Sequence, residues 1–168
     1  MRARIHRSTG QDRAVSISIT HVLTLGITTV LIAMLVTSAG TMLETETDRS
    51  AESSLETIGE RLADEIGNVD QIGSGSAHNA TIRSDHPQRV AGSRYTVELL
   101  ESGNCATASL LDGSTPCVKL TAEDANAEVY VPIKTDAGVD GGSSVSGGTI
   151  TIVYESGANE ISIEDGTQ

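Results

Sequence analysis

The sequence predicts an α+β protein: a long N-terminal transmembrane helix that continues into an amphipathic stalk, packed on a small antiparallel β-sheet head. Residues 15–43 contain no charged side chain, and residues 55–69 carry apolar side chains every three or four positions. After residue 76 the apolar period changes to two, as in strands. We divide the 168 residues into a basic leader (1–14), a transmembrane helix (15–39), a stalk helix (40–72) and an acidic β-rich domain (73–168).

The charge-free run is long enough to cross a lipid bilayer, because a helix needs roughly 20 mostly apolar residues to span about 30 Å of hydrocarbon. Its threonines suit lipid, since each hydroxyl can bond to a carbonyl one turn earlier. His21 lies near the basic end, where we expect it at headgroup depth. A cleaved secretory signal is the alternative, because residues 37–40 read Thr-Ser-Ala-Gly, but the apolar core of such a signal has only about 7 to 15 residues.

Charge is distributed unevenly along the chain. Residues 1–14 contain four arginines and one aspartate, a net +3, whereas the rest contains 7 basic and 22 acidic residues, a net −15. The positive-inside rule places the leader in the cytoplasm and the domain beyond Glu44 outside the cell, as a single-pass protein of the cell membrane. Nucleic acid is not expected as a partner of so acidic a domain. Such acidity fits either disorder or a surface adapted to high salt, and the regular apolar alternation favours the second.

The predicted stalk carries an apolar stripe on one face. Its members recur at helical spacing and are Leu55, Ile58, Leu62, Ile66 and Val69. Two ion pairs are in register, Glu46 with Arg49 and Arg61 with Glu65, each worth at most about 0.5 kcal/mol. Gly67-Asn68 is a plausible end of this helix.

Five segments of the acidic domain alternate apolar and polar residues. They lie at residues 94–100, 118–122, 127–131, 149–154 and 160–163. Glycine-containing turns separate them, which is typical of an antiparallel sheet. One face of this sheet is polar, and the other is expected to pack against the stripe of the stalk.

Two covalent features are predicted for the exterior side. Cys105 and Cys117 enclose eleven residues, and we expect a disulfide that closes a hairpin or loop and adds roughly 2 to 4 kcal/mol. Asn79-Ala80-Thr81 is the one N-x-S/T triplet of the chain, so Asn79 is a candidate glycosylation site.

No catalytic pattern is found in the sequence. His78 and His86 lack a neighbouring cysteine or a G-x-S-x-G elbow, and the glycine-rich stretch 138–148 lacks the Lys-Ser/Thr ending of a phosphate loop. Closely spaced acidic residues of the β-rich domain could bind Ca²⁺, but their spacing is not that of an EF-hand loop. We therefore expect no enzyme activity, no catalytic residues, no cofactor and no metal site.

The pentapeptide Asp12-Arg13-Ala14-Val15-Ser16, followed by a hydrophobic helix, a stalk and an acidic β-rich head, resembles the type IV pilin-like proteins of haloarchaea. The resemblance implies that Arg13, Ala14 and Val15 form a processing site, at which a prepilin peptidase cuts after Ala14. It also implies a pilin-like structural or assembly subunit of the archaeal cell surface, whose helix lies in the bilayer and then packs with other pilin-like subunits.

The sequence departs from the major pilins of that family. Major haloarchaeal pilins continue Val-Ser-Pro-Val-Ile-Gly, whereas this chain has Val-Ser-Ile-Ser-Ile-Thr from Val15. Ile19 occupies the fifth mature position, where bacterial pilins carry glutamate. These differences favour a minor or pilin-like subunit. The alternative is a bitopic, membrane-anchored extracellular binding or envelope protein that forms no filament.

Overall fold

The computed structural model describes residues 11–76, 78–107, 111 and 113–166, and of residues 11–18 and of Ser76 it describes the backbone alone. Within these residues the chain forms one long helix, α1 (Gln11–Ser76), a short 3-10 helix, η1 (Asn104–Thr107), and nine strands. Contacts divide the chain into two units, Met1–Glu44 and Thr45–Gln168, and each unit is described by itself.

In the first unit, α1 is already helical at Gln11, before the expected start at Val15. Five threonine hydroxyls donate to the carbonyl four residues earlier, over 2.8 to 3.2 Å, as predicted for threonines in an apolar helix. They are Thr24, Thr28, Thr29, Thr37 and Thr41.

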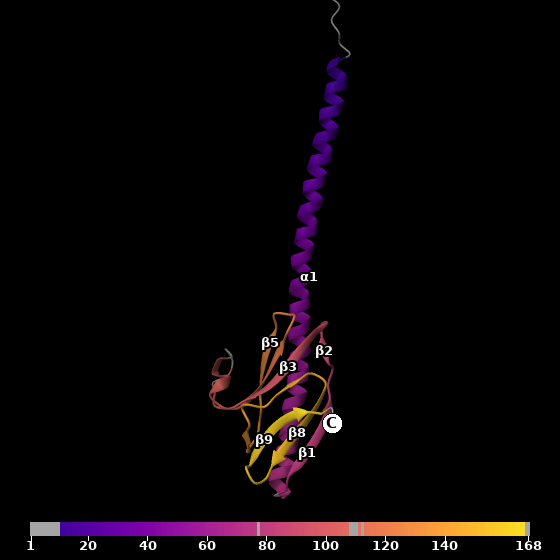
Figure 1. Cartoon of the computed structure of the whole chain (residues 1–168). Coiled ribbons are helices and arrows are strands. Elements are labelled where there is room, and N and C mark those ends of the chain that lie inside the picture. Colours follow the sequence, from indigo (N-terminus) through magenta and orange to yellow (C-terminus); the bar gives the residue numbers. More distant parts are fainter. Residues whose placement is uncertain (1–10, 77, 108–110, 112, 167–168) are drawn as a thin grey trace, which may run out of the picture. The chain divides into compact units, whose positions relative to one another are not determined.

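In the second unit, α1 continues to Ser76 and runs alongside the strands (Figure 1). The predicted end at Gly67-Asn68 is wrong, and the stalk passes its expected limit at residue 72. The reason is tertiary packing: Val69 is fully buried, and backbone amides of a distant loop donate to the Asp70 carboxylate. These contacts outweigh the helix cost of glycine, about 1 kcal/mol.

The strands form two sheets (Figure 1). The first has the order β1 (Ala80–Asp85), β8 (Thr149–Glu155), β9 (Glu160–Asp165), β6 (Gly138–Val139). The second has the order β2 (Arg89–Val90), β3 (Ser93–Leu100), β4 (Cys117–Ala122), β5 (Glu128–Pro132), and β7 (Ser144–Ser146) also pairs with β3. All neighbours are antiparallel except β6 and β9, which are parallel.

The five predicted strands are confirmed as β3, β4, β5, β8 and β9, with ends within two residues. The prediction of a single antiparallel sheet is wrong, because the strands divide between two sheets and one pair is parallel. The sequence analysis also missed β1 and the three short strands. The coarse class, a long N-terminal helix packed on mainly antiparallel sheets, is confirmed.

The core lies between α1 and both sheets. The apolar stripe of the stalk is confirmed, since each of its five members is at most 6% exposed. Gly59 permits a close approach to the second sheet: a Cβ there would lie 2.6 Å from Cγ2 of Val131. Gly73 does the same for the first sheet, where a Cβ would overlap the ring of Tyr154. The helix is therefore part of the hydrophobic core of the head.

Candidate functional site

The N-terminal part of α1 exposes its apolar side chains all round. Between Ile19 and Leu43, every Val, Ile, Leu and Met side chain is 53–71% exposed. An 18-residue window of this helix has a mean hydropathy of 2.1, and none of that window is buried. A core helix of a soluble protein would bury such a window. Among the residues that the structure describes, this is one helix near the N-terminus that is long and apolar enough to span a membrane.

A hollow interrupts this apolar surface at Gly26. Apart from its two chain neighbours and the backbone of the helix itself, no atom lies within 4 Å of the position that a Cβ would take there, and Val22, Leu23 and Val30 line the hollow. In lipid, small residues let the backbones of two helices approach closely, and packing drives their association. The hollow at Gly26 has the form that such packing requires.

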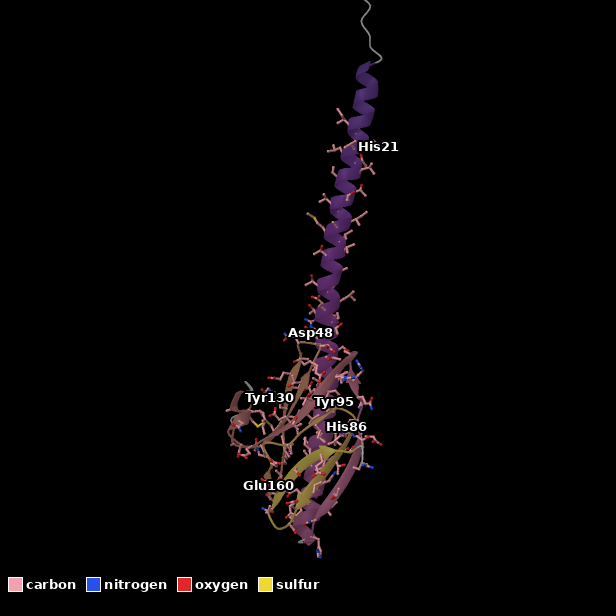
Figure 2. The ribbon with its side chains drawn as sticks, viewed as in Figure 1. His21, Asp48, His86, Tyr95, Tyr130 and Glu160 are labelled. Carbon is pink, nitrogen blue, oxygen red and sulfur yellow. A yellow bond between two sulfur atoms is a disulfide. The ribbon has the colours of Figure 1, made fainter. Side chains whose placement is uncertain are left out.

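The predicted processing residues lie at the start of the described chain. The backbone of Arg13, Ala14 and Val15 belongs to α1, while their side chains and residues 1–10 of the leader lie outside the described part. Processing after Ala14 stays a prediction. His21 is exposed on the same helix, close to its basic end (Figure 2).

The predicted disulfide is confirmed. Cys105 in η1 and Cys117 at the start of β4 are bonded, with their Cα atoms 6.1 Å apart and both residues fully buried. The bridge closes the connection between the antiparallel strands β3 and β4. A hydrogen bond from the Gly103 amide to the Gly113 carbonyl, 2.7 Å long, closes the same loop.

Asn79 lies exposed between α1 and β1. Its Oδ1 accepts hydrogen bonds from the amide and the hydroxyl of Ser156, over 3.0 and 2.9 Å. A glycan would be attached to the amide nitrogen, which takes no part in these two bonds. Glycosylation of Asn79 stays a prediction, at a position with an exposed side chain.

A polar cluster around Glu65 joins α1 to β1, and only its Arg61–Glu65 pair was predicted from the sequence. Oε1 of Glu65 accepts hydrogen bonds from Nε of Arg61 (3.0 Å) and from the hydroxyl of Ser84 (2.7 Å). The side chain of His86 is 1% exposed, and its Nε2 lies 3.3 Å from Oε2 of Glu65 (Figure 2). Because the Ser84 hydroxyl donates to Glu65 rather than to His86, this is not the arrangement of an activated nucleophile. The cluster ties helix to sheet.

Among the described residues, the fold shifts the pKa of Tyr95 and of Lys119. Tyr95 is fully buried, its hydroxyl donates to the Pro87 carbonyl over 2.7 Å, and burial raises its pKa to about 12. Nζ of Lys119 lies 3.3 Å from Glu128, beside the ring of Tyr130. Partial burial lowers the pKa of Lys119, but the hydrogen bond to Glu128 and its charge outweigh this effect and raise it.

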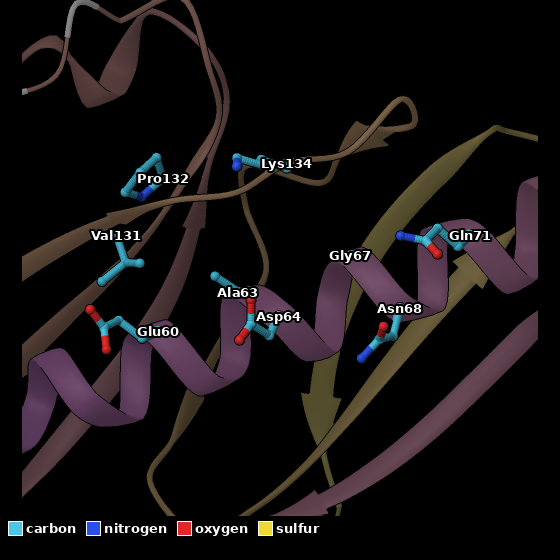
Figure 3. Close-up of a pocket in the computed structure, with 9 residues that line it drawn as sticks. All are labelled: Glu60, Ala63, Asp64, Gly67, Asn68, Gln71, Val131, Pro132 and Lys134. Atoms are coloured by element: carbon cyan, nitrogen blue, oxygen red, sulfur yellow. The ribbon is translucent and has the colours of Figure 1, made fainter.

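A groove of about 640 Å³ lies between α1 and the chain around β5 (Figure 3). Glu60, Asp64 and Gln71 face it from α1, and Pro132 and Lys134 lie across from them. Within the described ranges, no three or more His, Cys, Asp or Glu side chains are grouped so that they could hold a metal ion. The groove is a polar feature of the surface.

The fold and these sites define a class of protein: an α+β chain with an apolar, membrane-length N-terminal helix and a disulfide-bonded β-rich head. A family model matches residues 10–164, which is nearly the whole chain, and the protein belongs to that family, the Family of unknown function (DUF7266). No curated protein and no solved structure matches the chain.

Proposed function

We propose that the protein is a pilin-like structural or assembly subunit of a halophilic archaeal cell surface, anchored in the membrane by its N-terminal helix. The leader lies in the cytoplasm and the head outside the cell. The subunit acts by association and has no catalytic activity, cofactor or metal of its own.

One observation supports this proposal above the others. A single helix, α1, presents an apolar surface in its first part and supplies the central element of the head core in its second part. A cleaved signal would be released from the head, and nothing would then link head and membrane. A helix whose backbone continues into the head core suits a subunit that is first anchored in the bilayer and then assembled.

Charge and redox chemistry support the orientation. The leader carries four arginines, whereas the first base beyond the apolar run is Arg49, and by the positive-inside rule such an excess of arginine places the leader in the cytoplasm. The Cys105–Cys117 disulfide is of a kind that persists in oxidising surroundings outside the cytoplasm. The dense carboxylates suit a surface that works in high salt.

The proposed partners are the lipid bilayer, a prepilin peptidase and other pilin-like subunits. The leader opposes extraction from the bilayer, because its arginines would have to leave the cytoplasmic face. Cleavage after Ala14 should therefore precede assembly. The apolar surface and the hollow at Gly26 would then pack against the same surface of neighbouring subunits.

Blocking the processing site tests the proposal. The double variant Arg13→Asp with Ala14→Ile should keep its leader, remain in the membrane and be absent from the material sheared off the cell surface. The matched control Arg2→Asp makes the same charge change in the leader but outside the motif, and should be processed normally. If the wild-type protein also keeps Met1 and never reaches the sheared fraction, the subunit proposal fails. The anchored, filament-free binding or envelope protein then replaces it.

A further inference from the structure

The β2–β3 hairpin carries two arginines that oppose each other. Arg89 and Arg94 are direct cross-strand partners, and both are exposed. Like charges in this position destabilise a hairpin. Within the described residues, neither guanidinium has a carboxylate within 4.0 Å, and Arg89 donates instead to the Gly92 carbonyl. Glu123 lines one surface pocket with both arginines, and it forms no ion pair with either of them, so the pair still offers positive charge to an external carboxylate.

A strip of acids on α1 is a surface of the opposite charge. Glu52, Glu56, Glu60 and Asp64 follow one another at intervals of four and are all exposed. Like charges at this spacing destabilise a helix. Glu60 and Asp64 line the groove between α1 and β5, and Lys134 is the one base among its lining residues (Figure 3). We call the groove between α1 and β5, with Glu60 and Asp64 on its helix side, the acidic groove.

The two surfaces lie on opposite flanks of α1. The hairpin borders Ser54 and Thr57 of the helix, whereas Val131 of β5 packs at Gly59, next to the groove. Figure 1 shows β2 and β5 on the two sides of α1. A contact between different surfaces of identical chains is heterologous, and its repetition gives a ring if the rotation closes and an open row if it does not.

The tip of the hairpin consists of small residues. The hairpin turns through Ala91 and Gly92, whose φ angles are 47° and 84°. Two such small residues make a narrow tip, with an arginine on each side of it. The groove has a volume of about 640 Å³.

From these observations we propose that the β2–β3 hairpin of one copy docks in the acidic groove of a second copy. Arg89 and Arg94 pair there with Glu60 and Asp64 of the neighbour. The inference rests on the proposed function and deepens it, because it names the head contact between subunits. An anionic lipid surface is the other occupant that two arginines suggest, but the net −15 of the chain beyond its leader repels such a surface.

Photo-crosslinking in the native membrane tests the contact on the full-length chain. A benzophenone amino acid replaces Ala91, and a second copy carries a different tag. We expect a covalent dimer in which position 91 is joined to the neighbour's helix within residues 56–71. The same amino acid at Ala158, which is exposed in the β8–β9 turn, is the matched control and should give no dimer.

Charge reversal gives the second arm. Arg89→Glu with Arg94→Glu should lower the dimer yield at least about tenfold, because two attractions become two repulsions. A tagged partner with Glu60→Arg and Asp64→Arg should restore the yield, which a misfolded head would not do. A yield that is unaffected by reversal, or crosslinks only to lipid or to other proteins, overturns the inference.

The two proposals fail differently. Surface filaments without the crosslink at position 91 overturn the docking contact and leave the subunit function intact. The crosslink without protein in the sheared fraction supports the contact and overturns the filament function. The absence of both results overturns both proposals.

Discussion

Asp70 is expected to be the strongest single polar anchor between α1 and the sheets. Its residue is 5% exposed, Oδ2 accepts from the Asp136 amide over 2.9 Å, and Oδ1 accepts from the Ala137 amide over 3.3 Å. A hydrogen bond to a charged group contributes about 1.5 to 3 kcal/mol. The Ala137 amide also donates to Oγ1 of Thr135 over 3.1 Å, so only the Asp136 amide loses its sole acceptor.

Asp70→Ala should therefore lower the free energy of unfolding of the head by about 3 kcal/mol. Asp70→Asn, which keeps the shape and one acceptor oxygen, should lose roughly half as much. The chain has no Trp, and its three tyrosines all lie beyond residue 90, so tyrosine fluorescence during guanidinium unfolding of the detergent-solubilised chain follows the head.

Asp64→Ala is the matched control, because it removes the same charge from the exposed face of the same helix. Its effect should stay within about 0.5 kcal/mol. If Asp64→Ala and Asp70→Ala cost the same, net charge rather than the buried hydrogen bonds explains the loss, and the assignment of Asp70 as an anchor is refuted.

Three further outcomes are expected. The double variant Cys105→Ser with Cys117→Ser should lose about 3 kcal/mol, and reductant should destabilise the wild type equally while leaving the variant unchanged. Burial raises the pKa of Tyr95 from 10.0 to about 12, so the folded chain keeps a proton that the unfolded chain loses. The stability that the Tyr95 proton contributes is complete below pH 10. In the wild type the free energy of unfolding falls by about 3 kcal/mol as the pH rises through 12, and in Tyr95→Phe it does not. Finally, the melting temperature of the head should rise with salt, because the Debye length falls from about 30 Å at 0.01 M to about 3 Å at 1 M. A flat salt series would contradict the charge-repulsion argument.

Features with a local cause could be predicted from the sequence. The apolar run, the stripe on the stalk and the five longer strands each follow from a period in neighbouring residues. The Cys105–Cys117 bridge followed from a short spacing and an exterior location. The ion pairs of Arg49 with Glu46 and of Arg61 with Glu65 are present because their spacing on a helix fixes their distance.

Features that depend on distant residues could not be predicted in this way. The helix passes Gly67-Asn68 because Asp70 meets amides 66 and 67 residues further along the chain. Nothing local in the sequence indicates that His86 is buried against Glu65, 21 residues earlier. β1 contains one large apolar residue, Ile82, so its sequence carries no clear alternation.

The same limit applies to the candidate sites. β2 is two residues long, too short to be recognised by period, so the opposition of Arg89 and Arg94 is visible only in the folded hairpin. The acidic groove likewise needs β5 beside α1, although the spacing of its glutamates is plain in the sequence. The apolar surface from Ile19 to Leu43, by contrast, is local in origin, and the predicted transmembrane helix (15–39) covers most of it.

The mass of the protein recovered from sheared cell-surface material tests the central claim most directly. The proposal predicts an intact species that begins at Val15, lacks the four arginines of the leader and retains the Cys105–Cys117 disulfide. A protein that begins at Met1 and is found only in the membrane fraction would contradict processing and assembly together.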